Sequence, residues 1–177
     1  GYAQALKDPI IHLKFEENFE NSIANSYSGS KSGKVSFSEG VVGKGVQLGG
    51  GYIDLLGTND FNYSKGMSLS VWVKMNTDND FTNHAILYKA GPEDGDIALN
   101  FNFGYVLQLF QSEFGFKGDL GNEYFEFPGD PNQYKIDPSQ LVEKWAHIVT
   151  TFDGKEQKFY LDGEILHSEY VPEDVLK

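Results

Sequence analysis

Residue types that carry several common chemistries are absent or rare in this 177-residue chain. Cysteine is absent, which excludes disulfides, Cys-ligated zinc and thiol catalysis. Helix signals are scarce: residues 138–144 are predicted to form one or two turns, with Asp137 as the N-cap and Pro138 at the first helical position. No apolar run approaches the ~20 residues of a membrane span, so no membrane insertion is expected.

Basic residues are also few. The chain has 14 Lys and Arg residues against 26 Asp and Glu residues, which gives a formal net charge of −12. Such a surface repels phosphate backbones, so the sequence argues against nucleic acid as a partner. It suits neutral glycans, or Ca²⁺ ions held by carboxylate and carbonyl oxygens. The simpler interpretation is that the charge only keeps the domain soluble.

Aromatic residues and glycine are abundant instead, with 14 Phe, 10 Tyr and 20 Gly. Hydrophobic residues recur with a period of two, and because successive strand side chains point to opposite faces, each run predicts a half-buried β-strand. The runs begin with Ile11, Leu13 and Phe15 and continue through residues 46–48, 52–54, 68–74, 97–103, 146–152, 158–161 and 165–166. About eleven or twelve short strands predict an all-β sandwich or barrel, and the pattern alone does not choose between the two.

Turn residues separate these runs. Asp153-Gly154 and Asp162-Gly163 predict two hairpins in series, because Gly and Asp accept the positive φ of type I′ turns. Gly104 is expected to turn a further hairpin between residues 97–103 and 105–111. The Gly-rich and aromatic segment 112–135 is predicted to be a long loop, of the kind that often carries function.

Seven short segments follow one another along the chain: HLKFEEN (12–18), GVVGKGVQLG (40–49), GYID (51–54), MSLSVWVK (67–74), WAHIV (145–149), FDG (152–154) and FYLDG (159–163). In this order and spacing they resemble the laminin-G-like branch of the concanavalin A-like lectin and glucanase superfamily. The resemblance covers residues 10–168 and implies that Trp72 and Trp145, which occupy motif positions, belong to the core.

The resemblance implies a two-sheet antiparallel jelly-roll sandwich and one domain over residues 1–177. The family's usual closing strand, with a Gly-x-Ile-Asp-Asp-like motif, is not found before Lys177, so the sandwich is expected to lack this C-terminal strand. Members are mostly carbohydrate-binding or adhesive modules of secreted proteins. An extracellular, periplasmic or cell-surface location is therefore expected.

Some members also carry a structural Ca²⁺ ion. The early Asp of the family's calcium-linked segment corresponds here to Asn21 or Asn25, depending on the alignment. The resemblance therefore implies these two residues as candidate ligands in the oxygen-rich segment 18–26. The exchange of Asp for Asn removes negative charge from that site.

Glycan contacts are predicted from what sugars require, which is an exposed ring beside amide or carboxylate groups on one strand face. Asn100 and Asn102 lie on the face opposite their apolar neighbours, and Gln108 would share that face if the hairpin at Gly104 forms. The remaining predicted contacts are a ring from Tyr88, rim residues Asn83 and His84, and, as a second candidate, Tyr124 with Tyr134 in the long loop.

Carboxylate pairs with the arrangement of a glycoside hydrolase are not apparent. Residues 93–96 follow Gly-Pro and indicate a turn, and Glu123 and Glu126 would face opposite sides of a strand. We therefore predict a non-catalytic, lectin-like carbohydrate-binding module of an exported bacterial glycan-handling protein. The alternatives are a protein-binding adhesion module and, further off, a glycoside hydrolase of the same fold.

Overall fold

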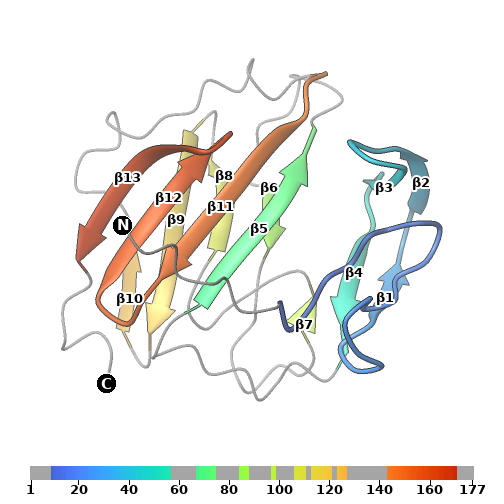
Figure 1. Ribbon diagram of the computed structural model, residues 1–177, viewed down its shortest axis with the longest axis horizontal. Helices are drawn as coiled ribbons and strands as arrows, with labels where there is room; N and C mark the ends of the chain where they lie inside the picture. Colours follow the sequence, from blue (N-terminus) through green and yellow to red (C-terminus); the bar gives the residue numbers. More distant parts are fainter. Residues whose placement is uncertain are drawn as a thin grey trace, which may run out of the picture. The chain divides into compact units, whose positions relative to one another are not determined.

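The chain is all-β where its structure is described. The computed structural model describes residues 9–56, 67–74, 84–87, 97–98, 106–110, 113–120, 123–126 and 143–170, and these form thirteen strands (Figure 1). Within these ranges there is no helix that could cross a membrane. The chain divides into two compact units, residues 1–58 and 59–177, which are described separately. The single domain over residues 1–177 stays a prediction.

The first unit contains two antiparallel strand pairs. Its strands are β1 (Gly29–Ser32), paired with β4 (Tyr52–Leu55), and β2 (Val35–Glu39), paired with β3 (Lys44–Leu48). Burial alternates along β4, where Ile53 and Leu55 are buried and Tyr52 is 48% exposed. Gly29 pairs with Leu55, and a Cβ there would lie 2.7 Å from Cγ2 of Ile53, so a larger residue would force a shift.

Residues 11–15 show the alternating burial expected of a strand, but they do not form one. Ile11, Leu13 and Phe15 are half-buried, but only an isolated bridge joins Leu13 to Asn21. The reason is local, because Phe15 has a φ of 58°, in the left-handed region that interrupts an extended chain. Its ring nevertheless packs edge-on against Phe19, with ring centroids 6.5 Å apart, and the prediction of a strand here is wrong.

The second unit contains a four-stranded antiparallel sheet in the order β13-β12-β11-β5 (Figure 1). Its strands are β5 (Met67–Val73), β11 (Ala146–Phe152), β12 (Glu156–Leu161) and β13 (Glu164–Tyr170). Four alternate residues of β11 are buried, which are Ala146, Ile148, Thr150 and Phe152. The two hairpins predicted in series, β11–β12 and β12–β13, are confirmed.

The two hairpin turns differ from each other. Asp162 and Gly163 have φ values of 49° and 86°, so both central positions have the positive φ of a type I′ turn, as predicted. At Asp153-Gly154 the prediction of a type I′ turn is wrong, because the loop spans three residues and only Gly154 has positive φ. Oδ1 of Asp153 accepts hydrogen bonds from the backbone N–H groups of Lys155 (2.9 Å) and Glu156 (2.7 Å), which stabilises the longer loop.

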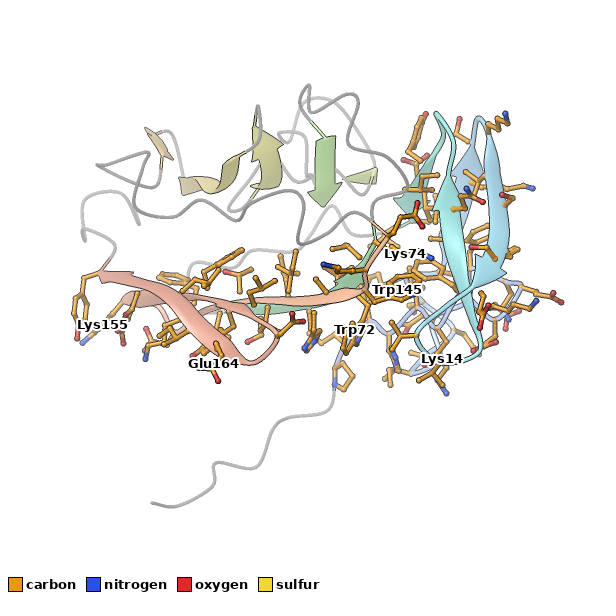
Figure 2. All side chains as sticks on the ribbon, turned by 90° about the horizontal axis from the view of Figure 1, so that it is seen from above. Lys14, Trp72, Lys74, Trp145, Lys155 and Glu164 are labelled. Carbon is orange, nitrogen blue, oxygen red and sulfur yellow. The ribbon has the colours of Figure 1, made fainter. Side chains whose placement is uncertain are left out.

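A second four-stranded antiparallel sheet has the order β10-β9-β8-β6. Its strands are β6 (His84–Leu87), β8 (Val106–Phe110), β9 (Glu113–Leu120) and β10 (Glu123–Glu126), and β7 (Ile97–Ala98) lies outside it. Figures 1 and 2 show this sheet as a separate layer over the β13-β12-β11-β5 sheet. The second unit is thus a two-layer β-sandwich, as expected from the sequence.

Two expectations about this sheet are wrong. Residues 113–120 and 123–126 form strands rather than part of a long loop, because the alternation of aromatic residues there outweighs the glycines between them. The hairpin expected at Gly104 is also absent over the described residues, because β8 pairs with β6 and β9 and not with β7.

The helical turn expected over residues 138–144 lies mostly outside the described residues. Only Glu143 and Lys144 are described there, and they form a turn and a bend in which Glu143 has a φ of 57°.

Candidate binding surface

The β13-β12-β11-β5 sheet has one buried face and one accessible face. Because side chains alternate along each strand, the face opposite Ile148 and Phe152 collects every second residue of the four strands. We call it the outer face. By the strand registers it contains Ser68, Ser70, Trp72, His147, Val149, Thr151, Glu156, Lys158, Tyr160, Ile165, Ser168 and Tyr170.

Trp72 is the largest residue of the outer face, and 48% of it is exposed. In Figure 2 its side chain projects from the sheet on the side away from the β10-β9-β8-β6 layer. The expectation that Trp72 belongs to the core is therefore wrong. The physical reason is the strand alternation, which gives Leu69, Val71 and Val73 to the inner face and leaves Trp72 on the outer one.

The indole of Trp72 is held in place by its cross-strand neighbour. His147 lies directly opposite on β11, and the two rings stack with centroids 4.7 Å apart and an interplanar angle of 19°. Such cross-strand ring pairs contribute beyond the area they bury. One face of the indole is thereby covered by imidazole, and the ring lies in a defined orientation.

The imidazole and the backbone of His147 are both held by hydrogen bonds. Nε2 of His147 lies 2.8 Å from Oγ of Ser70, two residues before Trp72 on the same strand, and the two atoms share a hydrogen bond. The backbone N–H of His147 donates to Oδ1 of Asp162 (2.8 Å), and the N–H of Asp162 donates to the carbonyl of His147 (2.8 Å). The Trp72–His147–Ser70 cluster is therefore preorganised by its own sheet.

Trp145, the other tryptophan, is half-buried beside the start of β11. Nζ of Lys74 lies 5.3 Å from the centroid of its ring, within the range of a cation–π interaction. This indole is therefore partly covered by a lysine side chain, whereas Trp72 keeps half of its surface open.

The far end of the outer face carries a charged cluster. The Ser168 hydroxyl donates a hydrogen bond to Oε1 of Glu156, and Nζ of Lys158 lies 2.9 Å from Oε2 of the same carboxylate. The hydrogen bond from Ser168, followed by that from Lys158, lowers the pKa of Glu156, and the Glu156 carboxylate raises the pKa of Lys158. The charge of Lys158 is thus neutralised locally.

The family follows from sequence and architecture together. The profile described as the concanavalin A-like lectin/glucanases superfamily matches residues 48–176, which is most of the chain. The chain belongs to this superfamily. Its laminin-G-like resemblance and its all-β sandwich architecture are both confirmed. No curated protein sequence matches the chain.

Solved structures of the superfamily's fold are similar at low sequence identity. Domain 4 of AbnA, an extracellular GH43 arabinanase from Geobacillus stearothermophilus solved with arabinotriose, has a TM-score of 0.57 at 18% identity, covering 87% of this chain and 70% of that one. The receptor-binding domain of botulinum neurotoxin D has a TM-score of 0.55 at 15% identity, covering 86% of this chain and 39% of that one.

The receptor-binding domain of the botulinum neurotoxin mosaic serotype C/D has a TM-score of 0.58 at 18% identity. It covers 89% of this chain and 38% of that one, so the chain spans less than two fifths of either toxin domain. Because the identities are only 15% to 18%, these neighbours show that the fold is shared and nothing more.

The predicted glycan contacts are only partly within the described residues. Asn83, Tyr88, Asn100, Asn102 and Tyr134 lie outside them.

His84, Gln108 and Tyr124 lie on β6, β8 and β10 of the second sheet. The register pairs Gln108 with Gly115 and Tyr124 with Asp119, which places both residues on one face, whereas His84 pairs with Leu109 on the other. Gln108 and Tyr124 thus lie two strands across and four residues along from each other, and their binding role stays a prediction.

Asn21, one of the two predicted calcium ligands, is buried and fully hydrogen-bonded. Its Oδ1 accepts from the backbone N–H groups of His12 (2.9 Å) and Ile23 (3.2 Å), and its Nδ2 donates to the carbonyls of Ile10 (3.0 Å) and Ser26 (2.8 Å). All hydrogen-bonding positions of the carboxamide are therefore used, and Ca²⁺ would have to replace one N–H at Oδ1.

Asn25, the other predicted calcium ligand, is exposed in a neighbouring bend. No three His, Asp or Glu side chains gather as a metal site within the part of the chain that is described.

Sequence reasoning assigned Trp72 to the core and so missed it as a surface ring. The signal was present in residues 67–74, where Trp72 shares its alternation class with Ser68 and Ser70 rather than with the apolar residues. A tryptophan on the polar side of an alternating strand indicates a ring at the surface.

Proposed function

We propose that this chain is a non-catalytic carbohydrate-binding module of an exported bacterial glycan-handling protein. The observation that carries the proposal is the half-exposed indole of Trp72, stacked on His147, whose imidazole shares a hydrogen bond with the Ser70 hydroxyl. Sugar rings present apolar C–H faces to such a ring and hydroxyl groups to the polar side chains beside it. Preorganisation of the ring lowers the entropic cost of binding.

The neighbours support this choice without deciding it. Domain 4 of AbnA was solved in complex with arabinotriose, and saccharide binding by the present chain would be analogous. The pair Glu123 and Glu126 does not favour catalysis, because positions three apart on strand β10 alternate between its faces. The carboxylates of residues 93–96, for which the sequence predicts a turn, lie outside the described residues.

A glycan array, followed by calorimetric titration of the saccharides that bind, tests the proposal. Trp72→Ala is expected to weaken binding by roughly 30-fold, because truncating a well-packed aromatic anchor typically costs about 2 kcal/mol. Tyr52→Ala is the matched control, because Tyr52 has the same 48% exposure but lies on β4 of the other unit. Absence of binding to any glycan, with and without Ca²⁺, would refute the function.

Protein binding is the second candidate function. Ile165 and Leu166 are adjacent on β13 and are 53% and 39% exposed, because a register shift between Phe159 and Tyr160 displaces this strand. Exposed apolar side chains beside each other favour a protein partner. If Ile165→Ser removes retention on a candidate receptor while Trp72→Ala does not, the adhesion function is favoured over glycan binding.

A further inference from the structure

Three aromatic residues of the outer face follow one diagonal across its strands. Trp72 lies on edge strand β5, Tyr160 lies on β12, and Tyr170 lies at the end of the opposite edge strand β13. Resting on the proposed function, we infer that this aromatic diagonal binds a linear, neutral polysaccharide chain over several sugar residues. Trp72 is the anchor at one end, and the two tyrosines extend the site.

The strand registers set the spacing of the three rings. Trp72 pairs with His147, whereas Tyr160 pairs with Val149, so Tyr160 lies two strands across and two residues along from Trp72. With strands about 4.8 Å apart and a rise of about 3.4 Å per residue, the two Cα atoms are about 12 Å apart. Because the two positions are this far apart, a single sugar ring cannot occupy both, but an oligosaccharide can.

The third position lies further toward the same end of the sheet, in a direction more nearly along the strands. Tyr160 pairs with Ile165 and Tyr170 pairs with Glu156, so Tyr170 lies one strand further and four residues along. The same spacings put the Cα atoms of Tyr160 and Tyr170 about 14 Å apart. Tyr170 is 73% exposed and Tyr160 is half-buried, so the ring of Tyr170 is open to a ligand and that of Tyr160 is partly open.

The residues between the rings suit sugar hydroxyls. Ser70 and Ser68 are exposed on β5, and Ser168 is exposed on β13. Thr151 and Lys158 lie between these strands at paired positions of the register. Hydroxyl and ammonium groups placed between rings can pair with the hydroxyls of a sugar chain, whose apolar faces meet the rings.

Local charge selects a neutral chain. The one lysine of the outer face, Lys158, is paired with Glu156 at 2.9 Å, so the pair has no net positive charge to attract a uronic acid. Asp162 adds a carboxylate beside His147, and the whole chain has a net charge of −12. An anionic polysaccharide would therefore be repelled, whereas a neutral one would not.

Titration of the intact chain with neutral oligosaccharides of increasing length tests the inference. Suitable probes are arabino- and cello-oligosaccharides from the mono- to the hexasaccharide, with oligogalacturonides as anionic counterparts. Affinity is expected to rise at least about tenfold, the equivalent of one further contact of ~1.4 kcal/mol, between the trisaccharide and the hexasaccharide. Oligogalacturonides of equal length are expected to bind at least about tenfold more weakly.

The tyrosine variants separate this inference from the proposed function. Tyr170→Ala and Tyr160→Ala should each reduce the gain in affinity between the trisaccharide and the hexasaccharide, whereas Tyr160→Phe, which keeps the ring, should retain the gain. Circular dichroism and a thermal melt verify folding, and Tyr52→Ala is the control.

If saccharides bind through Trp72 but the hexasaccharide gains nothing, or the tyrosine variants keep the gain, the diagonal is refuted and the function stands. If neither neutral series binds at any length, both fail.

Discussion

Asn21 shows, at the scale of single residues, how one side chain can organise a segment that has little regular structure. Its carboxamide joins Ile10 and His12 on one side to Ile23 and Ser26 on the other, and its backbone N–H donates to Oγ of Ser28 (3.2 Å). Buried polar groups of this kind are costly to leave without partners.

Asn21→Ala should therefore lower the free energy of unfolding by about 2 kcal/mol, because it removes the four hydrogen bonds of a buried carboxamide to backbone groups of the segment. Asn25→Ala, at an exposed position four residues away, should change it by less than about 0.5 kcal/mol. Urea denaturation followed by tryptophan fluorescence measures both. Equal effects of the two substitutions would contradict a structural role specific to Asn21.

Calcium is a separate prediction for the same two residues, and it rests on the family resemblance. If Ca²⁺ is bound at Asn21 and Asn25, a chelator should lower the midpoint of thermal unfolding and added Ca²⁺ should restore it, because a ligand of the native state stabilises that state. A midpoint of thermal unfolding that is unchanged by chelator would contradict Ca²⁺ binding at these residues.

The β11 strand is the central example at the scale of elements. It pairs with β5 on one side and β12 on the other, and its buried face includes Ile148, which is fully buried. Its accessible face presents His147 to Trp72. One strand therefore contributes to both the core and the candidate binding surface, through alternate residues.

Ile148→Ala should destabilise the protein by roughly 3 kcal/mol and lower the melting midpoint by about 10 °C, because it leaves a cavity in the core. Val149→Ala, on the opposite face of the same strand and only half-buried, should cost clearly less. Differential scanning calorimetry compares the two. Similar losses would mean that β11 does not have the two-faced burial described.

The Glu156–Ser168–Lys158 cluster makes the stability of the hairpin β12–β13 depend on pH. The pKa of Glu156 is lowered from its ordinary value of 4.5, first by Ser168 and then by Lys158, so the ionised carboxylate favours the folded state. Its contribution is present above pH 4.5 and is lost as the pH falls through the lowered pKa.

Glu156→Gln should accordingly lower the melting midpoint slightly at pH 7, and the difference from the original chain should disappear in acid, once the pH is below the lowered pKa of Glu156. The effect is small because the groups are solvated and screened. Glu164→Gln, at an exposed position for which no such hydrogen bond is described, serves as the control. A difference that persists unchanged in acid would contradict this assignment.

At the scale of the whole molecule, the two compact units raise the question of cooperativity. The family resemblance predicts a single domain over residues 1–177, which should unfold in one calorimetric transition whose van't Hoff and calorimetric enthalpies agree. Two separate transitions, one assigned to residues 1–58 through Ile53→Ala and the other to residues 59–177 through Ile148→Ala, would instead indicate two domains.

Strands were predictable wherever local pattern and turn chemistry agreed. Residues 146–170 show period-two alternation bounded by Asp-Gly turns, and both hairpins formed there. The prediction failed where glycines interrupted the alternation, as in β9, and where a positive φ ended it, as at Phe15.

For the candidate surface, too, some features followed from local sequence and others depended on pairing between distant strands. Alternation along β5 by itself determined that Trp72 lies opposite Leu69, Val71 and Val73. Only the tertiary structure decided that β5 pairs with β11, more than seventy residues later, and that Trp72 meets His147 while half of it remains exposed. Side-chain alternation is a property of the local chain, whereas register and exposure depend on pairing between distant segments, which no local pattern specifies.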